Sequence, residues 1–150
     1  MARKVGKDCK VTLGSSTVVG MGTWSVDGSS MDEFDSTAFG DNYKTYEYGC
    51  KDGGAITFDG FYDPSDSTGQ IALQLANLSN TAVTTLRLYV DNTSYYAPCQ
   101  TTGYFSPSNT TGFGTQLSSV RITSFNVKAD KSGLLTTSFT AKISGVMVLV

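Results

Sequence analysis

The sequence predicts one mainly β domain: a β-sandwich or partial barrel of two packed sheets, with one flanking α-helix and a long extended loop. Sixteen glycines, many Ser and Thr residues and a charged fraction of only 16% favour short strands joined by tight turns. Several segments alternate apolar and polar residues with the period of two that is typical of strands, whereas only residues 67–79 have a helical period. The 150 residues suffice for one hydrophobic core, so we expect residues 1–150 to form a single domain.

The chain begins with a polar, basic arm, residues 1–8, which we expect to stay flexible until a partner binds it. Its candidate contact residues are Arg3, Lys4 and Lys7. Residues 1–26 contain four basic residues against one acidic residue, and residues 27–66 contain ten acidic against two basic. This asymmetry predicts complementary surfaces and argues against nucleic-acid binding, which needs clustered Lys and Arg.

Two strand-like segments follow, residues 10–13 and 17–26, joined by a Gly-Ser-Ser turn of suitable length for a hairpin. Gly20 and Gly22 interrupt the second segment, which predicts a bend or the close approach of another backbone. We interpret Trp24 as a residue that packs against the core or on a sheet.

Residues 27–48 are rich in acidic and aromatic residues and show no sustained period of 2 or 3.6, so we expect a long irregular loop. Ordering about twenty loop residues costs on the order of 20–40 kcal/mol of backbone entropy, and such long loops are usually functional. The aromatic side chains offset that cost if another subunit buries them, since each covers about 150–250 Å². Within the loop 32–48 the candidate contacts are Asp32, Glu33, Phe34, Asp35, Phe39, Asp41, Tyr43, Lys44, Tyr46 and Tyr48.

The stretch 49–66, GCKDGGAITFDGFYDPSD, starts with a polar, glycine-rich turn and continues into the clearest strand of the chain. Residues 55–62 alternate, with Ile56 and Phe58 on one face, and Asp63-Pro64 ends the strand because proline cannot donate to a ladder.

A helix is predicted over residues 67–79, with Asp66 and Ser67 as possible N-caps. Asn80 is suited to the residue after the helix, where a left-handed conformation is common. The apolar face that we expect to cover a sheet contains Ile71, Leu75 and Leu78.

The C-terminal half predicts further strands. Residues 84–91 alternate with Leu86, Leu88 and Val90 inward, and residues 95–114 are interpreted as a broken hairpin. Residues 116–129 and 134–144 form the clearest hairpin, and residues 146–150 are expected to extend a sheet. The core residues expected in that hairpin include Val120, Ile122 and Phe139.

Catalytic and metal chemistry finds little support. The chain has no histidine, the usual general base of nucleophile sites and the commonest metal ligand. A glycosidase pair among the carboxylates of an acidic segment is expected by chance, as for Asp32, Glu33 and Glu47. We therefore expect no enzyme activity, no cofactor and no metal.

No segment approaches the ~20 apolar residues of a membrane span and the first residues lack a signal peptide, so cytoplasmic assembly is expected. The three cysteines, too widely spaced for a zinc site, are interpreted as reduced thiols: Cys9, Cys50 and Cys99.

The order of long loop, G-x-K-D-G-G turn, alternating strand with F-x-G, Y-D-P-x-D and helix resembles the major tail tube proteins of long-tailed, siphovirus-like bacteriophages. The resemblance covers the chain from Val26 to the C-terminus. These motifs are patterns of turns and strands and include no catalytic signature.

The resemblance implies a structural virion protein of the tail, assembled in the host bacterial cytoplasm, whose subunits form stacked hexameric rings. The inner sheets would close into a barrel through which DNA is ejected without specific binding, and the loop 32–48 would reach the neighbouring ring. Implied partners are the protein itself and the tape measure, tail-tip and tail-terminator proteins, with no membrane. Carboxylates not used in pairing are expected to line the lumen, although the irregular residues 95–114 leave the lumen strands unassigned.

The alternative is a monomeric β-sandwich module that binds a ligand, either a carbohydrate or a receptor. In that case aromatic side chains would stack on sugar rings. The candidates are Trp24, Tyr43, Tyr46, Tyr95 and Tyr96.

Overall fold

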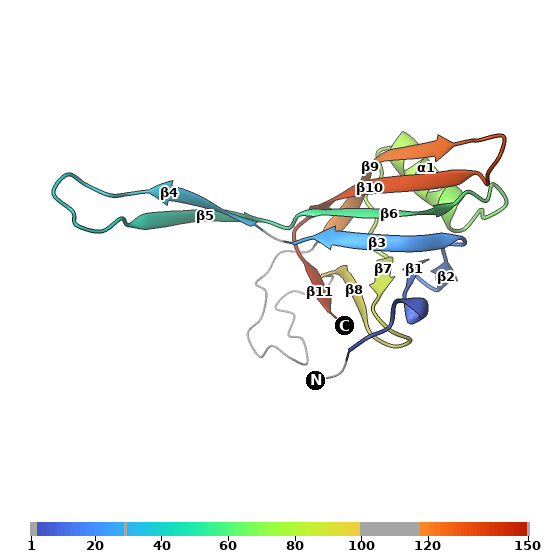
Figure 1. Ribbon diagram of the computed structural model, residues 1–150, viewed down its shortest axis with the longest axis horizontal. Helices are drawn as coiled ribbons and strands as arrows, with labels where there is room; N and C mark the ends of the chain where they lie inside the picture. Colours follow the sequence, from blue (N-terminus) through green and yellow to red (C-terminus); the bar gives the residue numbers. More distant parts are fainter. Residues whose placement is uncertain (1–2, 29, 100–117, 150) are drawn as a thin grey trace.

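The computed structural model describes residues 3–28, 30–99 and 118–149, and it confirms a mainly β fold with packed antiparallel sheets and one helix. Two sheets form the body, the helix lies alongside them, and a two-stranded hairpin extends far from one end (Figure 1). The first sheet has the order β3 (Met21–Asp27), β6 (Ala55–Phe61), β10 (Thr136–Ser144) and β9 (Ser119–Lys128). The second has the order β11 (Met147–Leu149), β8 (Tyr95–Pro98), β7 (Leu86–Tyr89), β1 (Lys10–Leu13) and β2 (Ser16–Thr17).

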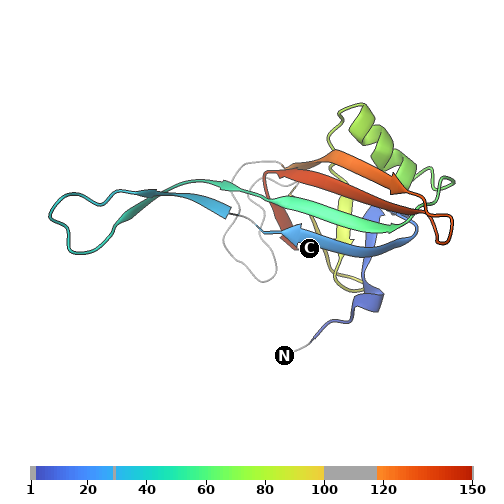
Figure 2. The same ribbon diagram turned by 45° about the horizontal axis from the view of Figure 1, so that its top comes forward.

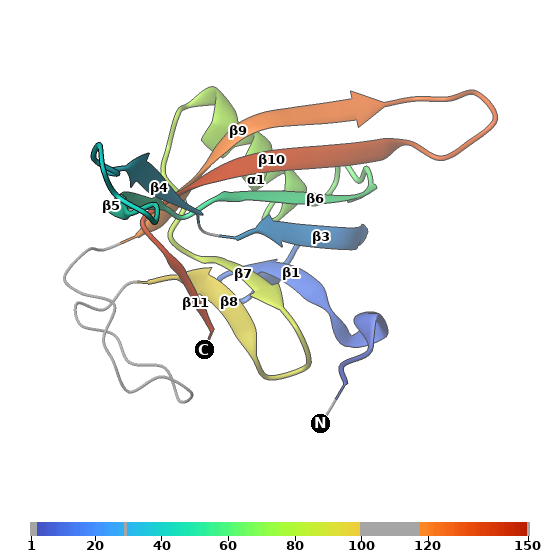
Figure 3. The ribbon, with the colours of Figure 1, turned by 60° about the vertical axis from the view of Figure 1, so that its left-hand side comes forward.

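The hydrophobic core lies between the two sheets, which Figure 3 shows as separate layers. Phe58 and Phe139 stack at its centre with ring centroids 5.2 Å apart, and Phe125 packs against Phe139. Trp24 is half-buried against the same cluster, as expected for a packing residue. The predicted inward positions of the strands are confirmed for Ile56, Phe58, Leu86, Leu88, Val120, Ile122 and Phe139.

The second predicted strand, residues 17–26, is divided between the two sheets. Its first residue ends β2, and the chain then crosses at Gly20 to begin β3 in the other sheet. Gly20 has a φ of 80°, and a Cβ there would contact the backbone oxygen of Phe61. The close backbone approach predicted at this segment is therefore confirmed for Gly20. Gly22 has no such neighbour.

Helix α1 (Gln70–Leu78) begins later than predicted, and its N-cap residue is Gly69. The Asp66 carboxylate nevertheless accepts a hydrogen bond from the Gln70 backbone amide at 3.0 Å, so Asp66 satisfies the first turn from outside the helix. The helix ends as expected, with Asn80 at a positive φ of 54°.

The predicted buried face of α1 was wrong. Leu73 and Gln70 are fully buried, whereas Leu75 and Leu78 are 58% and 72% exposed. The physical reason is the Gln70 side chain, which finds three backbone partners, at Val19, Phe61 and Asp63, and so favours burial of its own face of the helix. The helix lies beside β9, where the Asn77 amide donates to the Ile122 carbonyl oxygen at 2.8 Å.

The C-terminal predictions are largely confirmed. β9 and β10 form the predicted hairpin, with a register shift between Thr140 and Ala141, and β11 pairs with β8 as the expected extension of a sheet. The remainder of the broken hairpin predicted over 95–114 lies mostly outside the described residues.

Candidate assembly surfaces

The segment predicted to be an irregular loop is a β-hairpin that forms a sheet of its own. Strand β4 (Ser30–Asp35) pairs with β5 (Tyr46–Asp52), and the latter includes residues 49–52 that were expected to form a turn. Two features explain why the sequence shows no alternation of apolar and polar residues in these strands. A register shift between Met31 and Glu33 breaks the alternation, and both faces are exposed, so neither had to be apolar. The hairpin projects from the body along its long axis (Figures 1 and 2).

The tip of this hairpin is ordered by side-chain hydrogen bonds in place of a core. The Asp41 carboxylate accepts from the Ala38 amide at 2.8 Å, and the Thr37 hydroxyl accepts from the Thr45 amide at 3.0 Å. Hydrogen bonds from the Thr37 hydroxyl and amide hold the pKa of Asp35 below its usual value. The tip is therefore shaped before any partner contacts it.

Aromatic and acidic side chains alternate along the exposed hairpin. Tyr46 lies opposite Asp35 and Tyr48 opposite Glu33 on one face, and Phe34 lies over the backbone of Gly49 on the other. At the tip Phe39 is fully exposed and Tyr43 is 85% exposed. Contiguous exposed aromatic groups on a soluble protein mark an interaction surface. The structure thus brings all the candidate contacts of 32–48 together on one protruding element, which we call the assembly hairpin.

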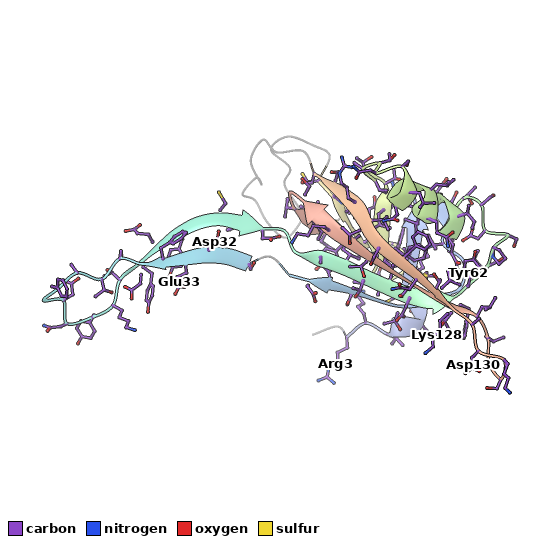
Figure 4. The ribbon with its side chains drawn as sticks, turned by 90° about the horizontal axis from the view of Figure 1, so that it is seen from above. Arg3, Asp32, Glu33, Tyr62, Lys128 and Asp130 are labelled. Atoms are coloured by element: carbon purple, nitrogen blue, oxygen red, sulfur yellow. The ribbon has the colours of Figure 1, made fainter. Side chains whose placement is uncertain are left out.

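The basic arm lies elsewhere and is not free. Residues Gly6–Asp8 form a turn of 3-10 helix, and the Lys4 ammonium pairs with the Asp91 carboxylate of the same chain at 2.8 Å. That pair, together with the Ser94 and Thr93 amides, lowers the pKa of Asp91 far below its usual value. These contacts hold residues 3–8 against the body within one chain, and the expected flexibility of the arm stays a prediction. Figure 4 shows Arg3 beside the body, away from Asp32 and Glu33 on the assembly hairpin.

A second exposed surface, which the sequence analysis missed, lies at the end of the body opposite the assembly hairpin. Figure 4 places Lys128 and Asp130 there, at the turn between β9 and β10, and Tyr62 also lies at this end, directly after β6. We call its apolar residues the distal patch, and they are Phe61, Val127, Leu134 and Leu135, all exposed. The signal that could have revealed this surface is the pair Leu134-Leu135 directly after the turn 130–133. A tight turn has few neighbouring residues, so two adjacent leucines beside it are expected to stay exposed.

The four-stranded sheet ends in two strands with little backbone pairing on their outer sides. β3 pairs only with β6 among the described strands. β9 pairs with β10, and on its other side Val120 bonds with Val83 and the Ile122 oxygen accepts from Asn77, which leaves residues 124–128 without a described strand beside them. Such edges are templates for pairing with another chain.

The aromatic residues of the alternative ligand-binding interpretation are only partly brought together. Trp24 and Tyr96 line a cavity of about 360 Å³ between the sheets, near Val26 and Met147. Tyr95 packs on Tyr89 with ring centroids 5.0 Å apart, and the two remaining tyrosines lie on the assembly hairpin.

The described residues offer no metal cluster and no membrane-spanning helix. In the described ranges, no three Cys, Asp or Glu residues are grouped closely enough to hold a metal ion. Of the helices described here, none is both long and apolar enough to cross a membrane. Among the described residues, Cys9 and Cys50 form no disulfide, as expected of reduced thiols, and Cys50 is exposed on β5.

Two packed antiparallel sheets, a flanking helix and a long protruding hairpin define the fold of phage tail tube proteins. The chain is similar to a protein in the virion of a native gene transfer agent particle, with a TM-score of 0.70 and 11% identity over 99% of both chains. It is similar to a protein in the tail of an empty gene transfer agent particle with C6 symmetry, at a TM-score of 0.67 and 14% identity over 99% of both. The SPP1 tail tube protein matches at 0.58 and 12% identity, over 98% of this chain and 78% of that one.

No protein-family profile and no curated protein sequence matches the chain. At 11–14% identity the structural likenesses show the fold. The fold is that of the tail tube, as the order of sequence motifs predicted.

Proposed function

We propose that the chain is the structural subunit of a phage-type tail tube, in which hexameric rings stack into a conduit for DNA ejection. The observation that carries the proposal is the assembly hairpin, whose aromatic side chains one copy of the chain leaves in solvent. The tail tube fold supports this role, and the C6 symmetry of the gene transfer agent tail supports six subunits per ring.

Ring closure uses the two open edges of the four-stranded sheet. The edge of β3 in one copy pairs with residues 124–128 of β9 in the next, because these edges lie at opposite sides of the same sheet. Repeating this head-to-tail contact around six copies closes a barrel and removes every edge. The exposed Leu75 and Leu78 of α1 lie next to the β9 edge and add apolar surface to the same contact.

Stacking uses the two ends of the long axis. The assembly hairpin of one ring packs its Phe39 and Tyr43 on the distal patch of the next ring, at the opposite end of the body. The hairpin carries six acidic residues against two basic ones over residues 30–52, and Lys128 and Lys131 flank the distal patch. Charge and apolar character are therefore complementary between the two ends.

In this role the protein belongs to the virion tail, is assembled in the bacterial cytoplasm and has no enzymatic activity. Its partners are further copies of itself and the tape measure, tail-tip and tail-terminator proteins. DNA passes through the lumen without specific binding.

The test is negative-stain electron microscopy of the concentrated, purified protein. We expect hollow tubes built of sixfold rings, since obligate interfaces of this kind commonly bury more than about 2,000 Å². Protein that stayed monomeric on a sizing column, even with tail-tip nucleators present, would contradict the proposal. A monomer that shifted on addition of a glycan would instead favour the ligand-binding alternative.

A further inference from the structure

We infer that the tube is lined by a surface rich in hydroxyl and amide groups whose charges nearly balance, over which the phosphate backbone of a DNA duplex passes without net attraction or repulsion. The inference rests on the proposed function and names the lining of that tube. When copies of the four-stranded sheet close into a barrel, one face of the sheet must face the bore. The five-stranded sheet covers the core face, so the open face is the one that lines the bore (Figure 3).

The strand register places hydroxyl side chains in a continuous row across this open face. Ser25 pairs with Thr57, Thr57 with Thr140, and Thr140 with Ser124, so one residue from each of the four strands lies in the row. Directly paired residues of antiparallel strands point to the same face. The next row, in the direction of the distal patch, runs through Thr23, Asp59, Ser138 and Asn126.

Contacts within the rows show that the side chains lie on this face together. The Ser25 and Thr57 hydroxyl oxygens are 2.6 Å apart, and the Asn126 amide donates to the Ser138 hydroxyl at 3.5 Å. Ser25, Thr57 and Asn126 are all exposed, so their remaining hydrogen-bonding capacity faces solvent. In a ring closed through β3 and β9, each row would continue from one subunit into the next.

Positive and negative charges on the open face nearly balance. Among the described residues, Asp27 and Asp59 contribute carboxylates, against Lys128, Lys142 and Arg121. Lys142 pairs with Asp52 at 2.8 Å, and Arg121 is turned to the Asn80 carbonyl and side-chain oxygens beside the helix.

This inferred lining differs from the sequence-based expectation of a lumen lined with surplus carboxylates. Of the ten acidic residues between 27 and 66, six lie on the assembly hairpin and only Asp27 and Asp59 lie on the open face. A lining without clustered Lys or Arg displaces no phosphate counterions, and a lining without clustered carboxylates does not exclude them. Hydroxyl groups instead hold a layer of exchanging water between wall and DNA.

The experiment measures entry of a short fluorescent DNA duplex into assembled tubes, compared with a neutral polymer of similar diameter. Sedimented tubes are equilibrated with each probe at ~0.01 M and ~1 M salt, where the Debye length is about 30 Å and about 3 Å. For the unaltered protein, we expect the ratio of DNA to polymer in the tubes to change by less than about twofold between these salt concentrations. The reason is that salt screens the net charge of the lining, which is small.

The paired variants Thr57→Glu with Thr140→Glu should exclude DNA at low salt and admit it at high salt, and Thr57→Lys with Thr140→Lys should retain it at low salt. Thr17→Glu, on exposed β2 of the other sheet, is the matched control and should behave as the unaltered protein. Strong salt dependence in the unaltered protein would overturn the inference without any variant. Tubes in which charge at Thr57 and Thr140 changed nothing would also overturn it, and the proposed function would stand. Failure of the unaltered protein to form tubes would overturn the proposed function and this inference together.

Discussion

Gln70 is a buried polar residue that joins the helix to the β2–β3 connection and to the end of β6. Its side-chain amide donates to the Val19 and Phe61 carbonyl oxygens at 2.6 and 2.7 Å, and its side-chain oxygen accepts from the Asp63 amide at 2.9 Å. Gln70→Leu keeps the size but leaves three backbone groups unpaired, each at a cost of about 1–3 kcal/mol when buried. We expect the free energy of unfolding, measured by urea denaturation, to fall by more than about 2 kcal/mol.

Gln74→Leu is the matched control on the same helix. The Gln74 side-chain nitrogen is buried with no hydrogen-bond partner in the described part of the chain, so removing it breaks no bond. This variant should be as stable as the unaltered protein or more so. Equal losses for the two glutamines would show that volume, and not hydrogen bonding, sets the effect at Gln70.

The Lys4–Asp91 pair predicts how the arm responds to pH. Because the pKa of Asp91 is lower in the folded chain than the unfolded value of about 3.9, the pair contributes its full stabilisation above that value. The contribution is lost only as pH falls through the lower, folded pKa. Hydrogen exchange of the Asp8 and Cys9 amides, which bond to Val5 and Gly6, should therefore stay protected at pH 4.

Asp91→Asn keeps an acceptor for the Thr93 and Ser94 amides and removes the charge that holds Lys4. Protection of the Asp8 and Cys9 amides should then fall severalfold at pH 7. Lys7→Ala is the control, since Lys7 has no ion pair among the described residues. Unchanged exchange in Asp91→Asn would mean that the 3-10 turn holds the arm without the ion pair.

At the scale of elements, the assembly hairpin is separate from the core, and its removal should abolish assembly without unfolding the body. Replacing residues 34–46 by a short Gly/Ser linker should preserve the β-rich circular dichroism spectrum and cooperative melting, because closure entropy changes slowly with loop length. Tubes should disappear from micrographs of the variant. Loss of the folded monomer would show that the hairpin contributes to the core.

The strands that the sequence revealed are those with one buried and one exposed face. β6, β7, β9 and β10 alternate because the core demands it, so their positions and inward residues could be read directly. The assembly hairpin buries neither face within one chain, and no period marks it. Its composition still led to the candidate contact residues, because exposed aromatic groups are unusual whatever their secondary structure, and their role as contacts stays a prediction.

For helix α1 the sequence predicted the position correctly but the buried face wrongly. Its position and its end at Asn80 followed from turn chemistry, but the choice of buried face depended on where the Gln70 amide finds backbone partners. Those partners come from Val19 and Phe61, which are distant in the sequence, and no local pattern contains them. Leu75 and Leu78 are exposed in the single chain, and in the proposed ring they would contact a neighbouring subunit. The helical period therefore did not identify the face of the helix that packs on the core.

For the whole molecule, the proposed stacking joins the assembly hairpin of one copy to the distal patch of the next, at opposite ends of the long axis. The variant Phe61→Ser with Leu134→Ser removes apolar surface from the distal patch, where the two side chains are 55% and 70% exposed. The monomer should keep its melting temperature, because exposed substitutions usually change stability by less than about 0.5 kcal/mol. Tube growth, followed by light scattering, should slow markedly. Normal growth would place the stacking contact elsewhere and leave ring closure as the remaining role of the fold.

The uneven charge of the chain predicts how tube growth depends on salt. Arg3 and Lys7 have no ion pair among the described residues, whereas Lys4 pairs with Asp91 in its own chain. In the proposed tube, Arg3 and Lys7 would therefore be available to the acidic hairpin of another ring. Single exposed pairs contribute about 0.2–1 kcal/mol, but they repeat around every ring and along the tube. Raising salt from ~0.15 M to ~1 M shortens the Debye length from about 8 Å to about 3 Å, so growth should slow.

A charge exchange separates this contact from general screening. Arg3→Glu with Lys7→Glu should slow stacking, because both changes set carboxylates against the acidic hairpin of the neighbouring ring. Adding Asp32→Lys with Glu33→Lys to the same chain should restore part of the growth rate, since the pairing returns with its signs reversed. Lys4 is left unchanged so that the arm keeps its place on Asp91. If the first pair of reversals changed neither the growth rate nor its salt dependence, the arm would have no part in stacking. The acidic residues of the hairpin would then pair only with Lys128 and Lys131, beside the distal patch.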